Sequence, residues 1–249
     1  MNFRVQIDGL KEFQAGLSDL AKAKIPQAVV DALNATAYGA RTAEQAEIGR
    51  SFTGPSPRIL RSPLYVKADF QRRYVEVVIS DKEFPGKTHM TPAGVLAPHI
   101  FGGGRKIKSS ERSLRFGYPG IFGSGQFITP GPGAKRDAYG NISGQEMVRI
   151  KSGAGIAEHA AGYMMNITAR SKKRNKGAYG NLFVSPRAGV FRRLGPNSII
   201  PVLYFSSAPT YRKRYKFHET FEAHVRANFM KNLVHAWGFS MLKAGRYGK

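Results

Sequence analysis

The chain has 249 residues, 42% of them hydrophobic, which is enough for a packed core in one large or two small domains and excludes global disorder. It carries 39 lysine and arginine residues against 16 acidic residues, a formal net charge of +23, and the lack of cysteine excludes disulfides and thiolate metal sites. No apolar run approaches the ~18 residues typical of a membrane span, and the first residues lack the pattern of a secretory signal, so we expect neither.

The basic charge is concentrated in one part of the chain. Between Glu158 and Glu219 there is no carboxylate, yet there are twelve basic residues. Such a segment repels itself unless nucleic acid, an acidic protein or a membrane surface lies nearby, and a solvated basic face is the alternative. The residues that we predict to meet a nucleic acid or an acidic partner are Arg170, Lys172, Lys173, Arg174, Lys176, Arg192, Arg193, Arg212, Lys213, Arg214 and Lys216.

The first predicted elements are a strand and two helices. Residues 3–7 alternate apolar and polar side chains, which predicts a short half-buried strand, and residues 10–23 place apolar residues at helical spacing. Pro26 is suited to a first helical turn and opens a second predicted helix that runs to Phe52. One face of this helix is rich in alanine, so another helix can approach it closely.

The middle of the chain changes in character. Two apolar runs, 64–68 and 74–79, predict a β-hairpin. Residues 84–145 then hold thirteen of the 28 glycines and six of the 14 prolines, a composition typical of a linker or a functional loop. We therefore expect one structural domain over residues 1–249, with 84–145 as an extended basic Gly/Pro-rich arm or insertion.

Helix and strand patterns return after the arm. Residues 147–168 could form a helix, residues 181–184 and 189–194 a hairpin, and residues 199–205 an apolar strand. Strands bracketed by long helices predict an α+β fold. Its expected parts are N-terminal helices including a long alanine-rich one, a small mainly antiparallel sheet, and a long C-terminal amphipathic helix.

The C-terminal helix has an unusual apolar pattern, with an apolar residue at every fourth position. The ladder consists of Phe217, Phe221, Val225, Phe229, Leu233, Trp237 and Met241. Each step of four residues overshoots a full turn by ~40°, so the ladder cannot stay on one face of a straight helix. We predict that its first half closes the chain's own core and that its second half contacts a neighbouring subunit. That subunit interface would consist of Phe229, Leu233, Trp237 and Met241.

Trp237 is the natural anchor of this interface, because large aromatic residues dominate interface energetics. Two alternatives stay open. The helix could touch one large core on two sides, and Trp237 could be an ordinary core residue.

Motifs for catalysis, cofactors and metals are lacking in the sequence. His218-Glu219 is not followed by the second histidine of a zinc-protease helix, and the glycines of residues 117–125 are interrupted by Pro119 and not framed by strand and helix. No serine lies in a nucleophile elbow, and acidic residues are too scarce for an evident acid–base pair. We therefore expect no enzyme, no cofactor and no metal site; a nuclease is disfavoured by the lack of a carboxylate cluster.

The two ends of the chain, roughly residues 1–80 and 180–240, resemble a phage family. The patterns are Phe3-x-Val5-x-Ile7-Asp8-Gly9-Leu10 before the helices, Phe183-Val184 and Gly189-Val190-Phe191-Arg192-Arg193 before the apolar strand, and Phe217-His218-Glu219 opening the last helix. Together they are similar to the minor tail protein Z group, the tail completion or head–tail joining proteins of tailed bacteriophages. The arm of residues 84–145 departs from the compact pattern of this group.

The resemblance implies a non-enzymatic virion component in the tail or neck, present in the host cytoplasm during assembly. It also implies a homo-oligomer, such as a ring, that contacts tail, terminator or connector proteins close to DNA and not a membrane. The alternative is a sequence-independent nucleic-acid-binding protein, in which the basic residues grip phosphate and Tyr211 and Tyr215 stack on bases.

Overall fold

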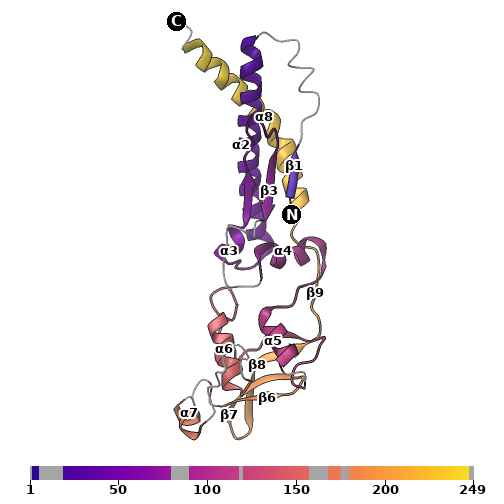
Figure 1. Ribbon diagram of the computed structural model, residues 1–249, viewed down its shortest axis with the longest axis vertical. Helices are drawn as coiled ribbons and strands as arrows, with labels where there is room; N and C mark the ends of the chain where they lie inside the picture. The colour runs from indigo at the N-terminus through magenta and orange to yellow at the C-terminus, as the bar shows by residue number, and fades with distance from the viewer. Residues whose placement is uncertain are drawn as a thin grey trace. The chain divides into compact units, whose positions relative to one another are not determined.

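The computed structural model describes residues 2–5, 19–79, 90–117, 120–156, 168–174, 179 and 181–246 (Figure 1). The α+β class is confirmed, with long helices near both ends of the chain and small antiparallel sheets. The chain forms two compact units, one of Met1–Gly86, Thr91–Phe101 and Lys213–Lys249, the other of Lys87–Met90 and Gly102–Arg212. This division differs from the predicted single domain with an arm.

Unit 1 is built on two long helices, α2 (Asp19–Ser51) and α8 (Phe217–Arg246), which run side by side (Figure 1). The two helices are antiparallel, because residues later in α2 pair with residues earlier in the C-terminal segment. The Asn232 amide donates to Thr36 Oγ1 at 2.9 Å, whereas the Tyr215 hydroxyl, just before α8, donates to Glu44. The predicted alanine-rich face of α2 is buried, including Ala32 and Ala40. Small side chains there let the α8 backbone come close.

The start of α2 differs from the prediction. The helix begins by Asp19, so Pro26 lies inside it instead of opening it. Residues 10–18 of the first predicted helix lie outside the described residues. The two predicted helices are therefore joined, over the described part, into one helix that continues through the proline.

A three-stranded antiparallel sheet in the order β1-β3-β2 packs on α2. Its strands are β1 (Asn2–Val5), β2 (Pro63–Val66) and β3 (Val75–Ile79), which confirms the N-terminal strand and the hairpin, and a short helix α3 (Pro57–Leu60) precedes β2. The alternating side chains Val75, Val77 and Ile79 are buried. Asn34 of α2 holds the hairpin by two hydrogen bonds to the Ala68 backbone, at 2.8 and 3.0 Å.

The described residues of the predicted arm, 90–117 and 120–145, do not form a separate extended segment. Its helix α4 (Pro92–Phe101) contributes Leu96 and Ile100 to the core of unit 1. The rest of the described arm belongs to unit 2, where Phe122 and Ile128 are buried in the core. The glycines and prolines dominate the composition, but widely spaced apolar residues between them are sufficient to anchor the segment.

Unit 2 contains a four-stranded antiparallel sheet in the order β5-β8-β7-β6. Its strands are β5 (Phe127–Pro130), β6 (Leu182–Ser185), β7 (Gly189–Gly195) and β8 (Ser198–Ser206), which confirms the predicted hairpin and apolar strand. The helices are α5 (Ser109–Gly117), α6 (Gly144–Gly153) and α7 (Ala169–Arg174), and β4 (Gly103–Gly104) pairs with β9 (Thr210–Tyr211). Helix α6 covers the first part of the predicted helix 147–168; residues 157–167 lie outside the described residues.

A fully buried carboxylate, Glu111, connects helix α5 to strand β5 of the sheet of unit 2. Both Glu111 oxygens accept hydrogen bonds from Arg105, and Glu111 also accepts the backbone N–H groups of Lys108 and Ile128. Burial would raise the pKa of the Glu111 carboxyl, but these donors stabilise its charge and hold the pKa below its usual value. The ionised form is thus the one that the fold is built around.

A second buried carboxyl, Glu44 of α2, has the opposite environment. Its Oε2 accepts the Tyr215 hydroxyl at 2.8 Å, while Oε1 has no hydrogen-bond partner among the described residues. Burial raises the pKa of the Glu44 carboxyl to about 8, opposed by the Tyr215 hydrogen bond and reinforced by Glu47 and Glu219. Keeping the proton avoids placing a charge on a buried oxygen with no donor.

We expect Glu44 to make the stability of unit 1 pH-dependent. The unfolded chain ionises this carboxyl near pH 4.5, whereas the folded chain keeps the proton to about pH 8, so its contribution to stability falls as pH rises between these values. The limiting slope is about 1.4 kcal/mol per pH unit. Chemical unfolding of the wild type and Glu44→Gln from pH 5 to 9 should show the variant gaining relative stability as pH rises.

The half-exposed Glu222, paired with Arg226, supplies the control for that measurement. Glu222→Gln should follow the wild type across the same pH range. A stability difference between wild type and Glu44→Gln that does not change with pH would show that Glu44 ionises normally.

Candidate assembly surfaces

The inner side of α8 packs along the core of unit 1 over most of its length. Phe217 and Phe221 are buried in one cluster with Ile48, Val77 and other residues of α2, β3 and α4. Phe229, Leu233 and Trp237 are partly buried against a second cluster that contains Ile25, Val29, Leu33 and Val75. The Met241 side chain lies outside the described residues.

The predicted interface residues are therefore placed differently from the prediction. Phe229, Leu233 and Trp237 contact the chain's own α2, and the alternative of a core touched on two sides describes the structure better. The drift of the ladder is real, but the two halves of α8 face two neighbouring clusters of the same unit. A sequence cannot distinguish a partner helix in the same chain from one in another chain.

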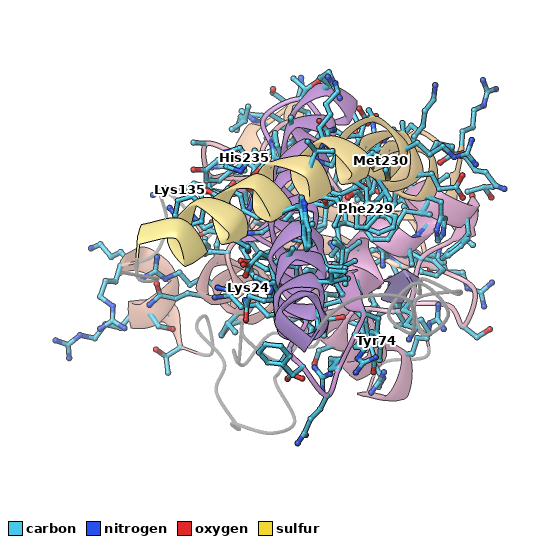
Figure 2. All side chains as sticks on the ribbon, turned by 90° about the horizontal axis from the view of Figure 1, so that it is seen from above. Lys24, Tyr74, Lys135, Phe229, Met230 and His235 are labelled. Atoms are coloured by element: carbon cyan, nitrogen blue, oxygen red, sulfur yellow. The ribbon has the colours of Figure 1, made fainter. Side chains whose placement is uncertain are left out.

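The outer side of α8 carries apolar residues that no other described element covers. Met230 and Val234, one turn apart, are 62% and 68% exposed, and Ala223 and Ala227 are exposed as well. At 100° per residue, these four positions fall within ~60° of one another on the helix. We call them the α8 outer stripe. Figure 2 labels Met230 together with the preceding residue Phe229, whose side chain packs against the second core cluster.

The outer stripe was missed in the sequence because the aromatic ladder dominates the helix. Its spacing of four, three and four residues is nevertheless that of an amphipathic helix face. Arg226, paired with Glu222 at 3.3 Å, and Lys231 are exposed on α8 near the stripe. An apolar strip with charged neighbours has the anatomy of a protein interface, an apolar centre with a polar rim.

Helix α7 presents the densest group of predicted basic residues. Its start is fixed by Thr168 and Ser171, each of which accepts the other's backbone N–H through its hydroxyl, at 3.1 and 3.0 Å. Arg170, Lys173 and Arg174 are exposed. The Lys172 side chain and Lys176 lie outside the described residues.

Arginines 192 and 193 of β7 have different roles despite their adjacency. Arg192 is half-buried and donates to the Gly133 carbonyl, so it is not part of an open basic surface. Arg193 is exposed, with its guanidinium 5.6 Å from the centre of the Phe183 ring. The strand alternation that separates their faces explains the difference.

The four basic residues of 212–216, namely Arg212, Lys213, Arg214 and Lys216, are all exposed. Arg214 also has a structural role, because its guanidinium lies over the Phe52 ring at 4.3 Å and its Nε donates to His99 Nδ1 at 3.2 Å. Burial and the Arg214 charge lower the pKa of His99 to about 4, so the imidazole is a neutral acceptor.

The exposed residues of the predicted basic set are divided between the two units. Arg170, Lys173, Arg174, Arg193 and Arg212 belong to unit 2, whereas Lys213, Arg214 and Lys216 belong to unit 1. Tyr215, predicted to stack on bases in the alternative hypothesis, is buried and bonded to Glu44.

Within the described residues, no three histidine or acidic side chains are grouped so that they could hold a metal ion. No described helix is long and apolar enough to cross a membrane. Comparisons of the chain with protein-family models, curated proteins and solved structures find no match.

The packing of α8 predicts how two substitutions on this helix differ. Trp237→Ala should lower the unfolding free energy by roughly 2–4 kcal/mol, because a half-buried indole leaves the α2 contact. Met230→Ala, on the outer stripe, should change it by less than ~0.5 kcal/mol. Urea unfolding of dilute protein measures both, and equal losses would contradict the inner and outer assignment.

Proposed function

We propose that this chain is a non-enzymatic structural protein of a tailed-phage virion, a tail completion or head–tail joining component that assembles as a homo-oligomer. The observation that carries the proposal is the α8 outer stripe, an apolar surface of unit 1 that is left open in the single chain. The resemblance of both chain ends to the minor tail protein Z group supports the assignment to tail or neck.

The outer stripe is suited to contact with another copy of the chain. Burying an exposed methionine or valine side chain contributes about 1.5–3 kcal/mol each, so Met230 and Val234 can form the centre of an interface. Ala223 and Ala227 leave room for a neighbouring helix to come close. Phe221, Val225 and Phe229 lie on the opposite side of α8 and pack in the chain's own core, which fixes the direction in which the stripe faces.

The exposed basic residues of α7 support a second contact, with an acidic protein or with DNA. Three of its five described side chains are exposed cations, and no acidic residue occurs between 159 and 218 to neutralise them. A surface of this kind contacts phosphate or carboxylate groups without reading a sequence. In a virion it would meet tail, terminator or connector proteins, or the genome.

The same observation favours the second candidate, a protein whose function is sequence-independent binding of nucleic acid. In that case oligomers would be incidental, and DNA affinity would fall steeply with salt. The burial of Tyr215 weakens this candidate, because it removes one of the two tyrosines expected to stack on bases.

Self-association through the stripe can be tested with acidic substitutions. The double substitution Met230→Glu and Val234→Glu should leave the fold intact but shift the protein to monomers, because it places negative charges in the proposed contact between two copies of the chain. Sedimentation velocity over a concentration series measures the change. Phe70→Glu, which alters an equally exposed apolar residue far from α8 in sequence, should assemble like the wild type.

A wild-type protein that stays monomeric alone and on isolated tails would overturn the assembly proposal. A monomer that instead binds duplex DNA tightly would favour the second candidate.

Charge reversal on α7 tests the second contact. Arg170→Glu, Lys173→Glu and Arg174→Glu together should reduce the yield of completed particles while circular dichroism and melting temperature stay unchanged. If DNA is the partner, the salt dependence of duplex binding should also flatten by about 0.9 per lost phosphate contact. Reversal of the exposed Lys67 and Arg112 gives a control with altered charge at other sites. Unchanged particle yield and unchanged DNA affinity would show that the basic residues of α7 contact only solvent and bind no partner.

A further inference from the structure

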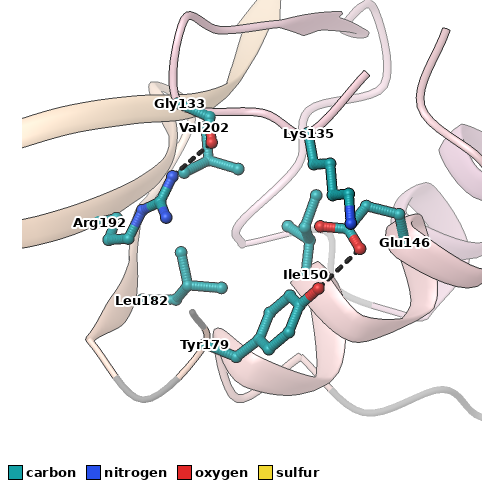
Figure 3. Close-up of a pocket in the computed structure, with 8 residues that line it drawn as sticks. All are labelled: Gly133, Lys135, Glu146, Ile150, Tyr179, Leu182, Arg192 and Val202. Carbon is teal, nitrogen blue, oxygen red and sulfur yellow. Dashed lines mark hydrogen bonds between the residues drawn. The ribbon is translucent and has the colours of Figure 1, made fainter. Parts of the chain in front are cut away.

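Unit 2 contains a cavity of about 180 Å³ between α6, the sheet and the segment after β5 (Figure 3). Ile150 of α6, Leu182 of β6 and Val202 of β8 form its apolar lining. The space is comparable to that of cavities that hold a benzene-sized molecule, about 150 Å³. The cavity can therefore take a branched aliphatic group or a single aromatic ring.

One polar wall of the cavity is internally satisfied. The Tyr179 hydroxyl donates to Glu146 Oε2 at 2.6 Å, and the α6 N-cap Ser143 fixes Glu146 by accepting its backbone N–H at 3.1 Å. Lys135 also lines the cavity (Figure 3). Arg149 lies 3.9 Å from the same carboxylate, so the negative charge of Glu146 is balanced.

The other polar wall is a cation that no described carboxylate balances. Arg192 lines the cavity across from Tyr179 and Glu146 (Figure 3) and donates from Nη2 to the Gly133 carbonyl. Its Nε is buried and has no hydrogen-bond partner among the described residues. Within that part of the chain Arg192 also makes no ion pair with a carboxylate.

A half-buried guanidinium whose buried Nε has no hydrogen-bond partner among the described residues, beside the apolar side chains of this cavity, has a specific complement. Buried polar groups in folded proteins are almost always paired, and the fork of a guanidinium matches the two oxygens of a carboxylate. Phosphate and sulfate would also suit the charge, but they leave the apolar lining empty. An acid with an apolar body fills both parts of the site.

We propose that this cavity binds a monocarboxylate with a small branched or aromatic apolar group, with the carboxylate on Arg192 and the apolar group between Ile150, Leu182 and Val202. Two sources share this chemistry: a free organic acid, and the C-terminal residue of a partner protein. The second source would deepen the proposed function by identifying how a neighbouring virion protein attaches.

Benzoate and its neutral isostere benzamide are suitable probes for the full-length protein. Benzoate should bind with a Kd in the millimolar range and shift NMR signals of residues around the cavity, and benzamide should bind at least about tenfold more weakly. Arg192→Met should weaken the binding of benzoate by a similar factor. Arg193→Met, a substitution of the same type at the next residue on the exposed face, should leave it unchanged.

Any of three results would overturn the proposed site. These are no benzoate binding up to about 50 mM, benzamide binding as tightly as benzoate, or an affinity of Arg192→Met for benzoate equal to that of the wild type. If Arg192→Met fails to fold, the comparison of benzoate with benzamide on the wild type still shows whether the carboxylate is recognised. A peptide ending in leucine with a free carboxylate, compared with its C-terminal amide, separates the two sources. Failure here leaves self-association through α8 untouched, because that surface belongs to unit 1.

Discussion

The close antiparallel contact of α2 with α8 is the interaction on which unit 1 depends. Alanine at positions such as 28, 32 and 40 of α2 lets the helices approach, and Gly39 lies so near the His224 ring that even a Cβ would collide with it. The sheet, the hairpin held by Asn34 and helix α4 all attach to this pair. Because α8 lies at the far end of the sequence, the unit is closed only when the chain has returned from unit 2.

This contact also determines which surfaces are left for other molecules. It occupies the aromatic ladder of α8 and leaves the smaller residues of the outer stripe exposed. The basic residues of unit 2 differ in the same way. Arg105 and Arg192 form hydrogen bonds within the unit, to Glu111 and to the Gly133 carbonyl, whereas the described basic side chains of α7 are exposed. The proposals of self-association, of an anionic partner and of a carboxylate site each rest on the groups that packing has not used.

The two buried carboxyls show how context decides the chemistry of one residue type. Glu111 is surrounded by donors and stays ionised, so it can connect Arg105, α5 and β5. Glu44 has a single donor and keeps its proton to about pH 8. Neither environment can be read from neighbouring residues in the sequence, since Tyr215 and Ile128 come from distant segments.

The sequence by itself determined the α+β class, the alanine-rich face of α2, the hairpins and the extent of α8, because these follow from local periodicity and turn residues. It also determined the excess of positive charge. Only the tertiary structure decided that Trp237 faces the chain's own α2, that the described part of residues 84–145 is divided between two cores, and that Arg192 borders a cavity. The reason is physical: periodicity shows that a face will be buried, whereas the identity of its partner depends on contacts between residues far apart in the chain.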